Sequence, residues 1–337
     1  MFGRGFRGSA GAISGMSLDE VAVIAAPRIS VVGVGGAGCN IASQIKQKRI
    51  VGVKVYALNS DAQHLASTDA DEKILIGYGL TGGLGCGGYP EKGAKAAEES
   101  ADEIEMRIGG SSLVFITAGL GGGTGTGASP VVAGIARKIG ALTISVVTLP
   151  FKVENSRLTK AVEGLKRLLE ACDSVIVIDN DKLRRAAGNL PLRRAFAAAN
   201  ELIAAFIKST SEAISLPSPL NMDFADLKAV MSGGGVCAIG VGEAVGEDRA
   251  VEAAEKALNT QLLEVGDFGK AEGALIHVEG GDDMTLEEVN RAAETIINRI
   301  SPKARVSWDA RVNDKMRDRI RVTAVLAGVE SPILSRR

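Results

Sequence analysis

The stretch Gly121-Gly122-Gly123-Thr124-Gly125-Thr126-Gly127 is the most informative part of this 337-residue chain. An apolar run typical of a buried strand precedes it at residues 112–117. A helical pattern follows at residues 129–139, where Ser129 and Pro130 favour a helix start. A glycine-rich turn between a strand and a helix lets backbone N–H groups approach an anion, which the helix dipole also attracts. We therefore predict that this loop holds the phosphate groups of a nucleotide.

Two further glycine clusters also follow expected strands. Gly33-Val34-Gly35-Gly36-Ala37-Gly38 matches G-x-G-x-x-G after residues 28–32, and Gly82-Gly83-Leu84-Gly85-Cys86-Gly87-Gly88 follows residues 73–76. Because the carboxyl ends of parallel strands meet at one edge of a sheet, the three loops would surround one ligand. None of them ends in the G-K-[ST] of a Walker A loop, so backbone amides, helix dipoles, Mg²⁺ and Arg157 are the candidates to meet the phosphate charge.

Apolar runs and helical patterns alternate along the first half of the chain. This alternation predicts an α/β fold with a Rossmann-like parallel sheet covered by helices on both faces. The expected strands are 28–32, 51–58, 73–76, 112–117, 142–148 and 174–178, and the expected helices include 40–48, 90–108, 129–139 and 157–171.

The second half predicts a smaller α+β domain. Its expected helices are 223–231, 249–259 and 286–300, and its strands are 236–242, 273–279, 305–311 and 320–327. The predicted organisation is a flexible extension at 1–27, a nucleotide-binding domain at 28–191, a long amphipathic connecting helix at 192–216, the α+β domain at 217–329 and a short tail at 330–337.

Composition argues against several classes of function. The formal net charge is -1 and only 4% of residues are aromatic, so we expect no nucleic-acid partner. No apolar run reaches the roughly 18 residues that a membrane span needs, so we expect no direct membrane insertion. The four cysteines (Cys39, Cys86, Cys172, Cys237) are widely spaced and the histidines His64 and His277 stand alone, which predicts no metal site built from side chains and fits a reducing cytoplasm.

G-x-G-x-x-G is also the fingerprint of NAD-dependent oxidoreductases. That hypothesis predicts an acidic residue at the end of the second strand to bind a ribose hydroxyl. The sequence has Asn59 there and Asp61 two positions later, and no acid/base pair for hydride transfer accompanies them. The oxidoreductase hypothesis therefore stays open as the less favoured alternative.

The loop at 121–127 resembles the signature loop of the tubulin superfamily, which is far more specific than G-x-G-x-x-G. Other stretches resemble the FtsZ family, the prokaryotic cell-division GTPases of that superfamily. They are residues 35–40, NSDAQ at 59–63, LPF at 149–151, NMDFAD at 221–226 and MSGGG at 231–235. The resemblance extends from about Arg28 to Val329, nearly the whole chain. It implies a GTPase that polymerises head-to-tail into a filament at the division site in the cytoplasm, with membrane-anchoring or other division proteins as partners.

The resemblance also implies which residues bind GTP or GDP. Mg²⁺ would be bound mainly through the phosphates. The implied phosphate contacts are Gly35, Gly36, Ala37, Gly38 and Cys39, residues 122–127 at the α- and β-phosphates, Cys86, Gly87 and Gly88 at the γ-phosphate, and Arg157. Glu154 would bind the ribose. The guanine would meet Asn180 and Asn200 at its edge and Phe196 stacked on its ring, with Asn40 on the same side and Asn59 close by.

Asp223 and Asp226 stand three positions apart where a helix is expected to begin. Taken alone, this spacing is typical of acidic residues that cap a helix. The resemblance instead implies a catalytic role for both, together with Asn221. They would reach the nucleotide of the next subunit and position water for attack on the γ-phosphate. A head-to-tail contact that does not close generates a filament, so hydrolysis would follow polymerisation.

The sequence departs from the family pattern at three places. The segment from Glu154 to Arg157 is one residue shorter than the usual E-G-x-x-R and lacks its glycine, and Tyr89 replaces a common asparagine. The chain ends soon after the last expected strand, which suggests an archaeal-type member in which residues 331–337 are a candidate docking segment for an anchor. The shortened segment also leaves a second alternative open, an FtsZ-like filament protein or regulator that binds nucleotide and hydrolyses it weakly.

Overall fold

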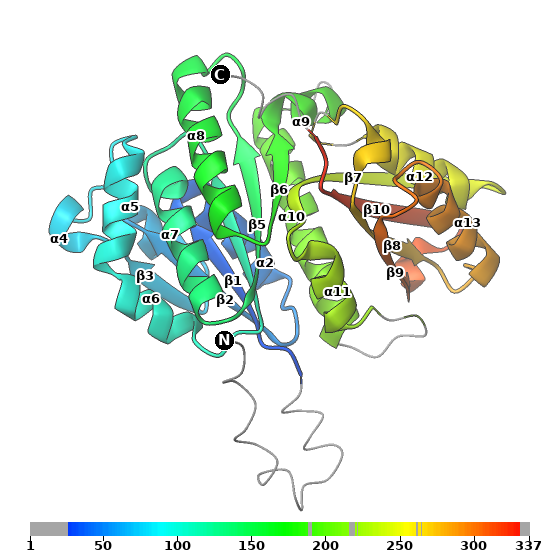
Figure 1. Ribbon diagram of the computed structural model, residues 1–337, viewed down its shortest axis with the longest axis horizontal. Coiled ribbons are helices and arrows are strands. Elements are labelled where there is room, and N and C mark those ends of the chain that lie inside the picture. The colour runs from blue at the N-terminus through cyan, green and yellow to red at the C-terminus, as the bar shows by residue number, and fades with distance from the viewer. Residues whose placement is uncertain are drawn as a thin grey trace, which may run out of the picture.

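A computed structural model describes residues 26–187, 191–215, 220, 222–260, 262–263 and 265–330. Within these residues the strands form one ten-stranded sheet in the order β3-β2-β1-β4-β5-β6-β7-β10-β8-β9. Helices cover both faces of the first part of the sheet, and Figure 1 shows α10 standing between that part and the strands β7 to β10. The expected α/β class and parallel sheet are confirmed.

The first six strands are parallel, and all of them except the edge strand β3 are mostly buried. They are β1 (Ile29–Val34), β2 (Val53–Asn59), β3 (Glu72–Leu75), β4 (Leu113–Gly119), β5 (Leu142–Leu149) and β6 (Ser174–Asp179). All six residues of β1 and of β6 are buried, as expected for strands covered on both faces. The helices among them are α2 (Gly35–Gln47), α3 (Ala62–Ser67), α4 (Tyr78–Thr81), α5 (Pro90–Glu99), α6 (Ala101–Ile108), α7 (Thr124–Lys138), α8 (Asn155–Ala171) and α9 (Asn180–Ala187).

Two apolar layers hold these helices against the sheet. One contains Val114 and Ile116 of β4 with Val132 of α7 and Leu165 of α8. The opposite layer contains Phe115 of β4, whose ring meets Phe206 of α10 (Leu192–Ser215) edge-on with centroids 6.1 Å apart. Because neighbouring residues of a strand point to opposite faces, β4 contributes to both layers.

The sheet continues without a break into the second half of the chain. Strand β7 (Gly235–Val245) pairs in parallel with β6 from Ser174 to Ile176, and the antiparallel β10 (Arg319–Ala327) then joins β7 to β8 (Gly273–Gly280). Strand β9 (Arg305–Val312) lies at the edge. The helices of this half are α11 (Phe224–Met231), α12 (Arg249–Asn259) and α13 (Leu286–Ile297). The expected elements are found, except that residues 90–108 form two helices, α5 and α6, with a break at Ser100. The domain boundaries stay a prediction.

Two helix starts differ from the expectation. Helix α7 begins at Thr124 rather than near Ser129, so Pro130 lies inside it, and α2 begins at Gly35 rather than at residue 40. Glycine disfavours helices in isolation, and it concealed both first turns in the sequence. Within the described ranges, none of the helices is long and apolar enough to cross a membrane.

Candidate nucleotide-binding site

The three glycine loops pack against one another at the carboxyl edge of the parallel strands. A Cβ atom placed on Gly35, which has φ +70°, would lie 2.7 Å from the backbone nitrogen of Gly125. One placed on Gly123 would lie 2.8 Å from the Cβ of Cys86 and 3.1 Å from the backbone nitrogen of Gly88. A side chain does not fit at either position, so glycine is what lets the loops converge.

Two helix N-termini face this convergence, those of α2 and α7. Neither has a side chain that caps it or an acidic residue in its first turn. The first N–H groups of a helix have no partner within the helix and carry the positive end of its dipole. Around Gly122, beside the start of α7, a Cβ atom would meet no atom within 4 Å, which leaves room for a ligand. The arrangement favours an anion such as a polyphosphate.

Hydrogen bonds of side-chain hydroxyl groups hold the glycine loops in place. The Ser60 Oγ lies 2.7 Å from the Thr124 Oγ1 and 3.2 Å from the Cys86 Sγ, and it is fully buried. The backbone nitrogen of Gly121 donates to the Thr126 Oγ1 at 2.8 Å. The two threonines of the glycine loop therefore hold its conformation. Ser60 was not among the predicted site residues, because a single serine carries no recognisable pattern.

The side chain of Cys39 points into the core, where it packs with Ala57 and Leu65. It is fully buried, and its Sγ lies 3.7 Å from the carbonyl oxygens of Gly33 and Leu58. Burial raises the pKa of the Cys39 thiol to about 12, so the thiol stays protonated. Any contact of Cys39 with a phosphate would come from its backbone. Gly36 and Ala37 are exposed in the same first turn, and Gly38 is buried against Thr117.

Polar side chains at the end of β2 already form hydrogen bonds within the protein. The Asn59 Nδ2 lies 3.3 Å from the His64 Nδ1, and the Asn59 Oδ1 accepts from the backbone nitrogen of Asp61. Asp61 caps α3 by accepting from the backbone nitrogen of His64 at 3.0 Å. The carboxylate that a dinucleotide would need for its ribose is therefore committed to a helix cap. His64, whose ring lies 3.8 Å from a Cβ placed on Gly36, was missed because a lone histidine gave no signal.

Glu154 and Arg157 form an ion pair at the start of α8. The Arg157 Nη1 donates to the Glu154 Oε2 at 2.8 Å, while the Glu154 Oε1 accepts from the backbone nitrogen of Phe151. The backbone of Arg157 lies beside the glycine loop, since a Cβ on Gly121 would be 2.9 Å from its carbonyl oxygen. The backbone is thus at the loop while the guanidinium is paired with a carboxylate and 64% exposed.

The residues implied at the guanine edge come from three helices on one side of the site. Asn180 is buried at the start of α9, Asn200 is half-buried on α10, and Asn40 is exposed on α2. Helix α10 packs against both α9 and α2, which brings the three helices together. Phe196 lies in α10, but its side chain falls outside the described residues.

Asp223 and Asp226 form a capping box at the start of α11. The backbone nitrogen of Asp226 donates to the Asp223 Oδ1 at 2.7 Å, and that of Asp223 donates to the Asp226 Oδ2 at 3.4 Å. Both residues are exposed, and Asn221 lies outside the described residues. The expected cap is therefore present, and it leaves the carboxylates open to solvent.

The capping box lies far from the glycine loops within one chain. Helix α11 ends at Met231, whose carbonyl oxygen accepts from the Oγ of Ser174, the first residue of β6. Helix α9 follows the last residue of β6, so it lies at the other end of that strand, on the side of the sheet where the glycine loops are. Figure 1 shows this separation, with α9 at the top and α11 lower down. Helix α11 therefore lies towards the edge of the sheet opposite the glycine loops.

The described residues offer no ready cage of protein ligands for a metal. No group of three or more His, Cys, Asp or Glu side chains in that part of the chain could hold an ion. A cation at the loops would therefore take its ligands mainly from a bound polyphosphate and from water.

Comparison with known proteins identifies the family. The sequence model of the tubulin/FtsZ family GTPase domain matches residues 28–188, and the sequence model of the FtsZ family C-terminal domain matches residues 235–330. The cell division protein FtsZ 2 of Methanocaldococcus jannaschii is 50% identical over 308 residues, which cover 90% of this chain and 81% of that protein.

Solved structures agree with this assignment. An empty FtsZ dimer of M. jannaschii matches with a TM-score of 0.86 at 47% identity, covering 93% of this chain and 93% of that one. A GTPγS-bound protofilament of CetZ2 from Haloferax volcanii matches with a TM-score of 0.78 at 25% identity, covering 91% of this chain and 95% of that one. The chain therefore belongs to the FtsZ family, the cytoskeletal GTPases of cell division within the tubulin superfamily, and is similar to its archaeal members.

Proposed function

We propose that this chain binds GTP at the glycine loops and hydrolyses it only where a second copy supplies Asp223 and Asp226. One observation carries the proposal: the anion-binding loops and the exposed carboxylate pair lie at opposite edges of the same sheet. Two copies stacked head-to-tail bring the carboxylate edge of one chain onto the loops of the next. Such a contact repeats without closing, so it builds a filament.

The phosphates would be held mainly by backbone N–H groups. The first turn of α2 would bind through Gly35, Gly36, Ala37, Gly38 and the backbone of Cys39, and the first turn of α7 through residues 121–127. Cys86 and Gly88 pack against Gly123, which would place them and the intervening Gly87 at the terminal phosphate. Preorganised backbone donors require no rearrangement as charge develops, which is the main demand of phosphoryl transfer.

The sugar and base would lie towards α8, α9 and α10. Glu154 at the ribose and Asn180, Asn200 and Phe196 at the guanine continue from the phosphate loops along this side, with Asn40 and Asn59 at its border. An amide presents both a donor and an acceptor, as the guanine edge requires. The side-chain oxygens that the loops present are hydroxyls, which fits a Mg²⁺ held mainly through phosphates and water. That ion would neutralise part of the phosphate charge.

Asp223 and Asp226 would orient the attacking water from the second copy, together with Asn221. In the isolated chain their carboxylates accept hydrogen bonds from each other's backbone nitrogen and remain exposed. A carboxylate has capacity for further hydrogen bonds, so both can accept from a water while the cap persists. Phosphoryl transfer depends mainly on such positioning, and a single copy lacks it.

The similarity to cell division proteins supports a place for this filament at the division site. The similarity to a dimer and to a protofilament supports assembly from copies of one chain. Membrane-anchoring or other division proteins would then attach the filament. We place the protein in the cytoplasm, where GTP is available.

The test is the rate of GTP hydrolysis per chain across a wide range of protein concentrations, followed together with light scattering. We expect turnover per chain to be negligible at high dilution and to rise steeply where scattering begins, because two copies form each site. A rate per chain that stays constant to the lowest dilution would contradict hydrolysis between subunits. GTP binding with little turnover at every concentration would instead support a filament protein or regulator with weak hydrolysis.

A further inference from the structure

Lys160 of α8 lies at the junction of two of the phosphate loops. Its Nζ donates to the carbonyl oxygen of Gly88 at 2.8 Å and stands 5.7 Å from the centre of the Tyr89 ring. The Lys92 Nζ is 5.3 Å from the centre of the same ring. A backbone carbonyl and an aromatic ring attract an ammonium group without neutralising its charge.

The face of α8 that carries Lys160 runs along the glycine loop. Arg157 lies beside Gly121, and a Cβ on Gly164 would be 2.4 Å from the Thr126 Cγ2. Residues at these spacings share one side of a helix, so Lys160 lies on the loop side between them. Gly88, which holds its ammonium, itself packs on Gly123 at the start of α7.

The charges at this place are unevenly paired. Arg157 already donates to Glu154, so its guanidinium adds little net positive charge. Among the described residues, neither Lys92 nor Lys160 has a carboxylate within ion-pair distance. Lys160 is therefore the uncompensated cation in direct contact with a phosphate loop.

From this geometry we infer that Lys160 sets the preference of the site for a nucleoside triphosphate over a diphosphate. The inference rests on the proposed function of the loops. A terminal phosphate seated against residues 86–89 lies beside the ammonium held on Gly88, whereas a diphosphate ends short of it. An ammonium group has three donors and Gly88 takes one, so two remain for phosphate oxygens. Tyr89 is a positioning residue, because its ring lies 5.7 Å from the ammonium and keeps the charge at the loop.

The test compares the binding of guanosine 5′-(β,γ-imido)triphosphate and of GDP by calorimetry to the full chain in the presence of Mg²⁺. We expect Lys160→Met to raise the dissociation constant of the triphosphate roughly tenfold and that of GDP less than about twofold, since one ammonium-to-phosphate contact is lost. Lys160→Arg keeps the charge and should retain most of the preference. Lys166→Met is the matched control, because Lys166 is exposed on the same helix.

Tyr89 gives a second, independent measurement. Tyr89→Leu removes the ring and should lower the triphosphate preference about threefold, the size of an exposed cation–π contact, whereas Tyr89→Phe should leave it unchanged.

Three results would overturn the inference. An equal loss of affinity for both ligands in Lys160→Met would show a merely structural role, and unchanged dissociation constants for both would show that the ammonium does not sense the terminal phosphate. If the unmodified chain bound neither guanine nucleotide, the proposed function would fail together with this inference.

Discussion

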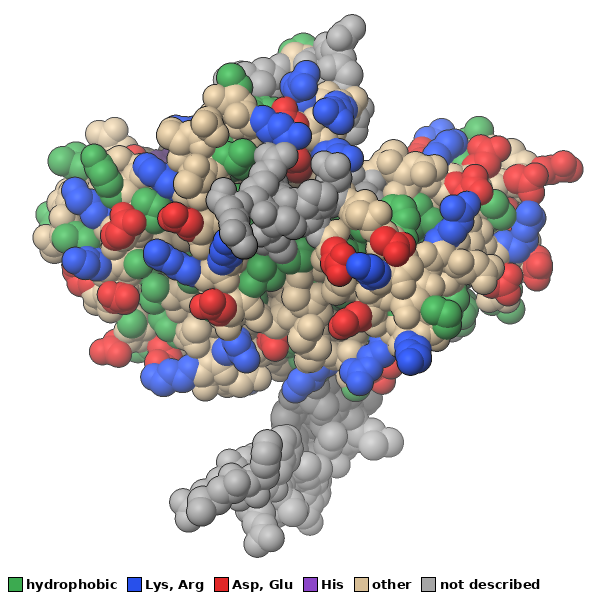
Figure 2. Space-filling view, turned by 45° about the horizontal axis from the view of Figure 1, so that its top comes forward, with side chains coloured by type: hydrophobic (Ala, Val, Ile, Leu, Met, Phe, Trp, Pro, Cys, Tyr) green, Lys and Arg blue, Asp and Glu red, His purple; other side chains and the backbone are tan. Residues whose placement is uncertain are grey.

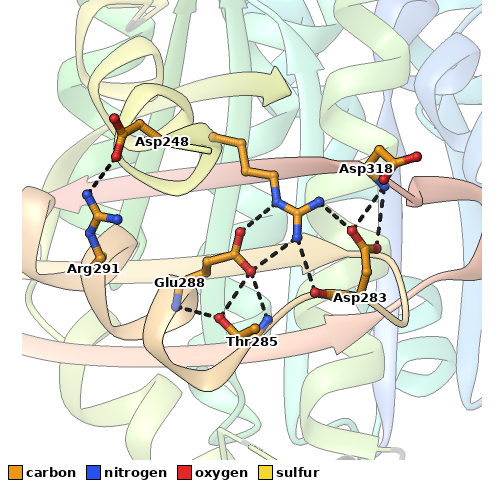
Figure 3. A network of polar contacts seen from close by, with 7 residues as sticks. Asp248, Asp283, Thr285, Glu288, Arg291 and Asp318 are labelled. Atoms are coloured by element: carbon orange, nitrogen blue, oxygen red, sulfur yellow. Dashed lines mark hydrogen bonds and ion pairs between the residues drawn. The ribbon is translucent and has the colours of Figure 1, made fainter. Parts of the chain in front are cut away.

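The glycine loops and the ion-pair network around Arg249 differ in whether their polar groups find partners inside the protein. Figure 3 shows the network, in which Glu288 lies beside Thr285 and Asp283 lies beside Asp318. The Arg249 guanidinium donates to Glu288 and to Asp283, each at 2.6 Å, and Glu288 also closes a capping box with Thr285. The backbone nitrogen of Asp318 donates to the Asp283 carboxylate. The network thus satisfies its charges internally.

The glycine loops leave the backbone N–H donors at two helix N-termini without a side-chain cap. The N-termini of α2 and α7 have neither a side-chain cap nor an acidic residue, although α13 has both. A cap satisfies orphan N–H groups and stabilises a helix, whereas uncapped groups keep their capacity for a ligand. The same backbone N–H groups therefore serve stability where a side chain of the protein caps them and binding where a ligand does. We expect changes in the loops to alter binding and changes in the network to alter stability.

The largest expected effect comes from placing a charge in the open loop. Gly122→Asp should weaken GTP binding roughly 100-fold, because a carboxylate beside the phosphates repels them in a site with few compensating charges. The fold should persist, since a Cβ at Gly122 meets no atom within 4 Å. Gly134→Asp is the control, as Gly134 is an equally open position further along α7. Calorimetric titration measures both, and equal binding by the two variants would place the phosphates elsewhere.

The next effect concerns the carboxylate pair. Asp226→Ala should lower GTP turnover roughly 100-fold while sparing GTP binding, because positioning of the attacking water is lost. The variant also loses half of a capping box, so its stability should fall by about 1 kcal/mol. Thr285→Ala removes the N-cap half of the capping box of α13 and measures the cost of opening such a box away from the site. If Thr285→Ala reduced turnover as much as Asp226→Ala, the loss would come from the cap alone.

Breaking the network should change stability and leave binding intact. Arg249→Leu leaves two carboxylates without their partner and should lower the free energy of unfolding by about 2 kcal/mol, towards the lower end for buried pairs because the carboxylates are partly exposed. Thermal or urea unfolding measures the loss. The dissociation constant for GTP, measured on the folded protein, should stay unchanged. A weakened affinity would show that the two regions are coupled.

The smallest effect is a change in acid sensitivity. The Arg249 guanidinium holds the pKa of the Glu288 carboxyl below its ordinary value of 4.5, and it also lowers the pKa of the Asp283 carboxyl. A carboxyl whose pKa is lowered by folding contributes stability above its ordinary pKa and loses it as the pH falls through the lowered value. The melting temperature of the unmodified chain should therefore fall more steeply below about pH 4.5 than that of Arg249→Leu. If the melting temperatures of the two proteins fell equally with decreasing pH, the ion pairs of Arg249 would contribute nothing to the acid sensitivity.

The sequence predicted the strands better than the starts of the helices. Apolar runs such as residues 142–148 identify buried strands because a sheet covered on both faces leaves few polar positions. The first turns of α2 and α7 were missed because glycine opposes helix formation locally, and packing of Gly35 on Gly125 overrides it. That the sheet runs unbroken from β6 into β7 was also not predicted, since pairing between strands this far apart leaves no local pattern.

For the site, residue types were predictable and pairings were not. The glycine loops follow from spacing alone. The commitment of Arg157 to Glu154, the burial of the Cys39 thiol and the contact of Lys160 with Gly88 depend on where side chains point after folding. The position of Asp226 at the far edge of the sheet is likewise a property of the tertiary fold.

The most direct test of a site shared between copies mixes two variants that each lack a different half. Gly122→Asp keeps Asp226 but should bind GTP roughly 100-fold more weakly, so it is used at GTP concentrations that leave its site empty. Asp226→Ala binds GTP but lacks the carboxylate. Each alone should be nearly inactive. An equal mixture should recover about a quarter of the unmodified turnover, since one random neighbour pair in four joins two intact halves. If Asp226→Ala alone hydrolysed GTP at the unmodified rate, or if the mixture were no more active than its components, hydrolysis between subunits would be contradicted.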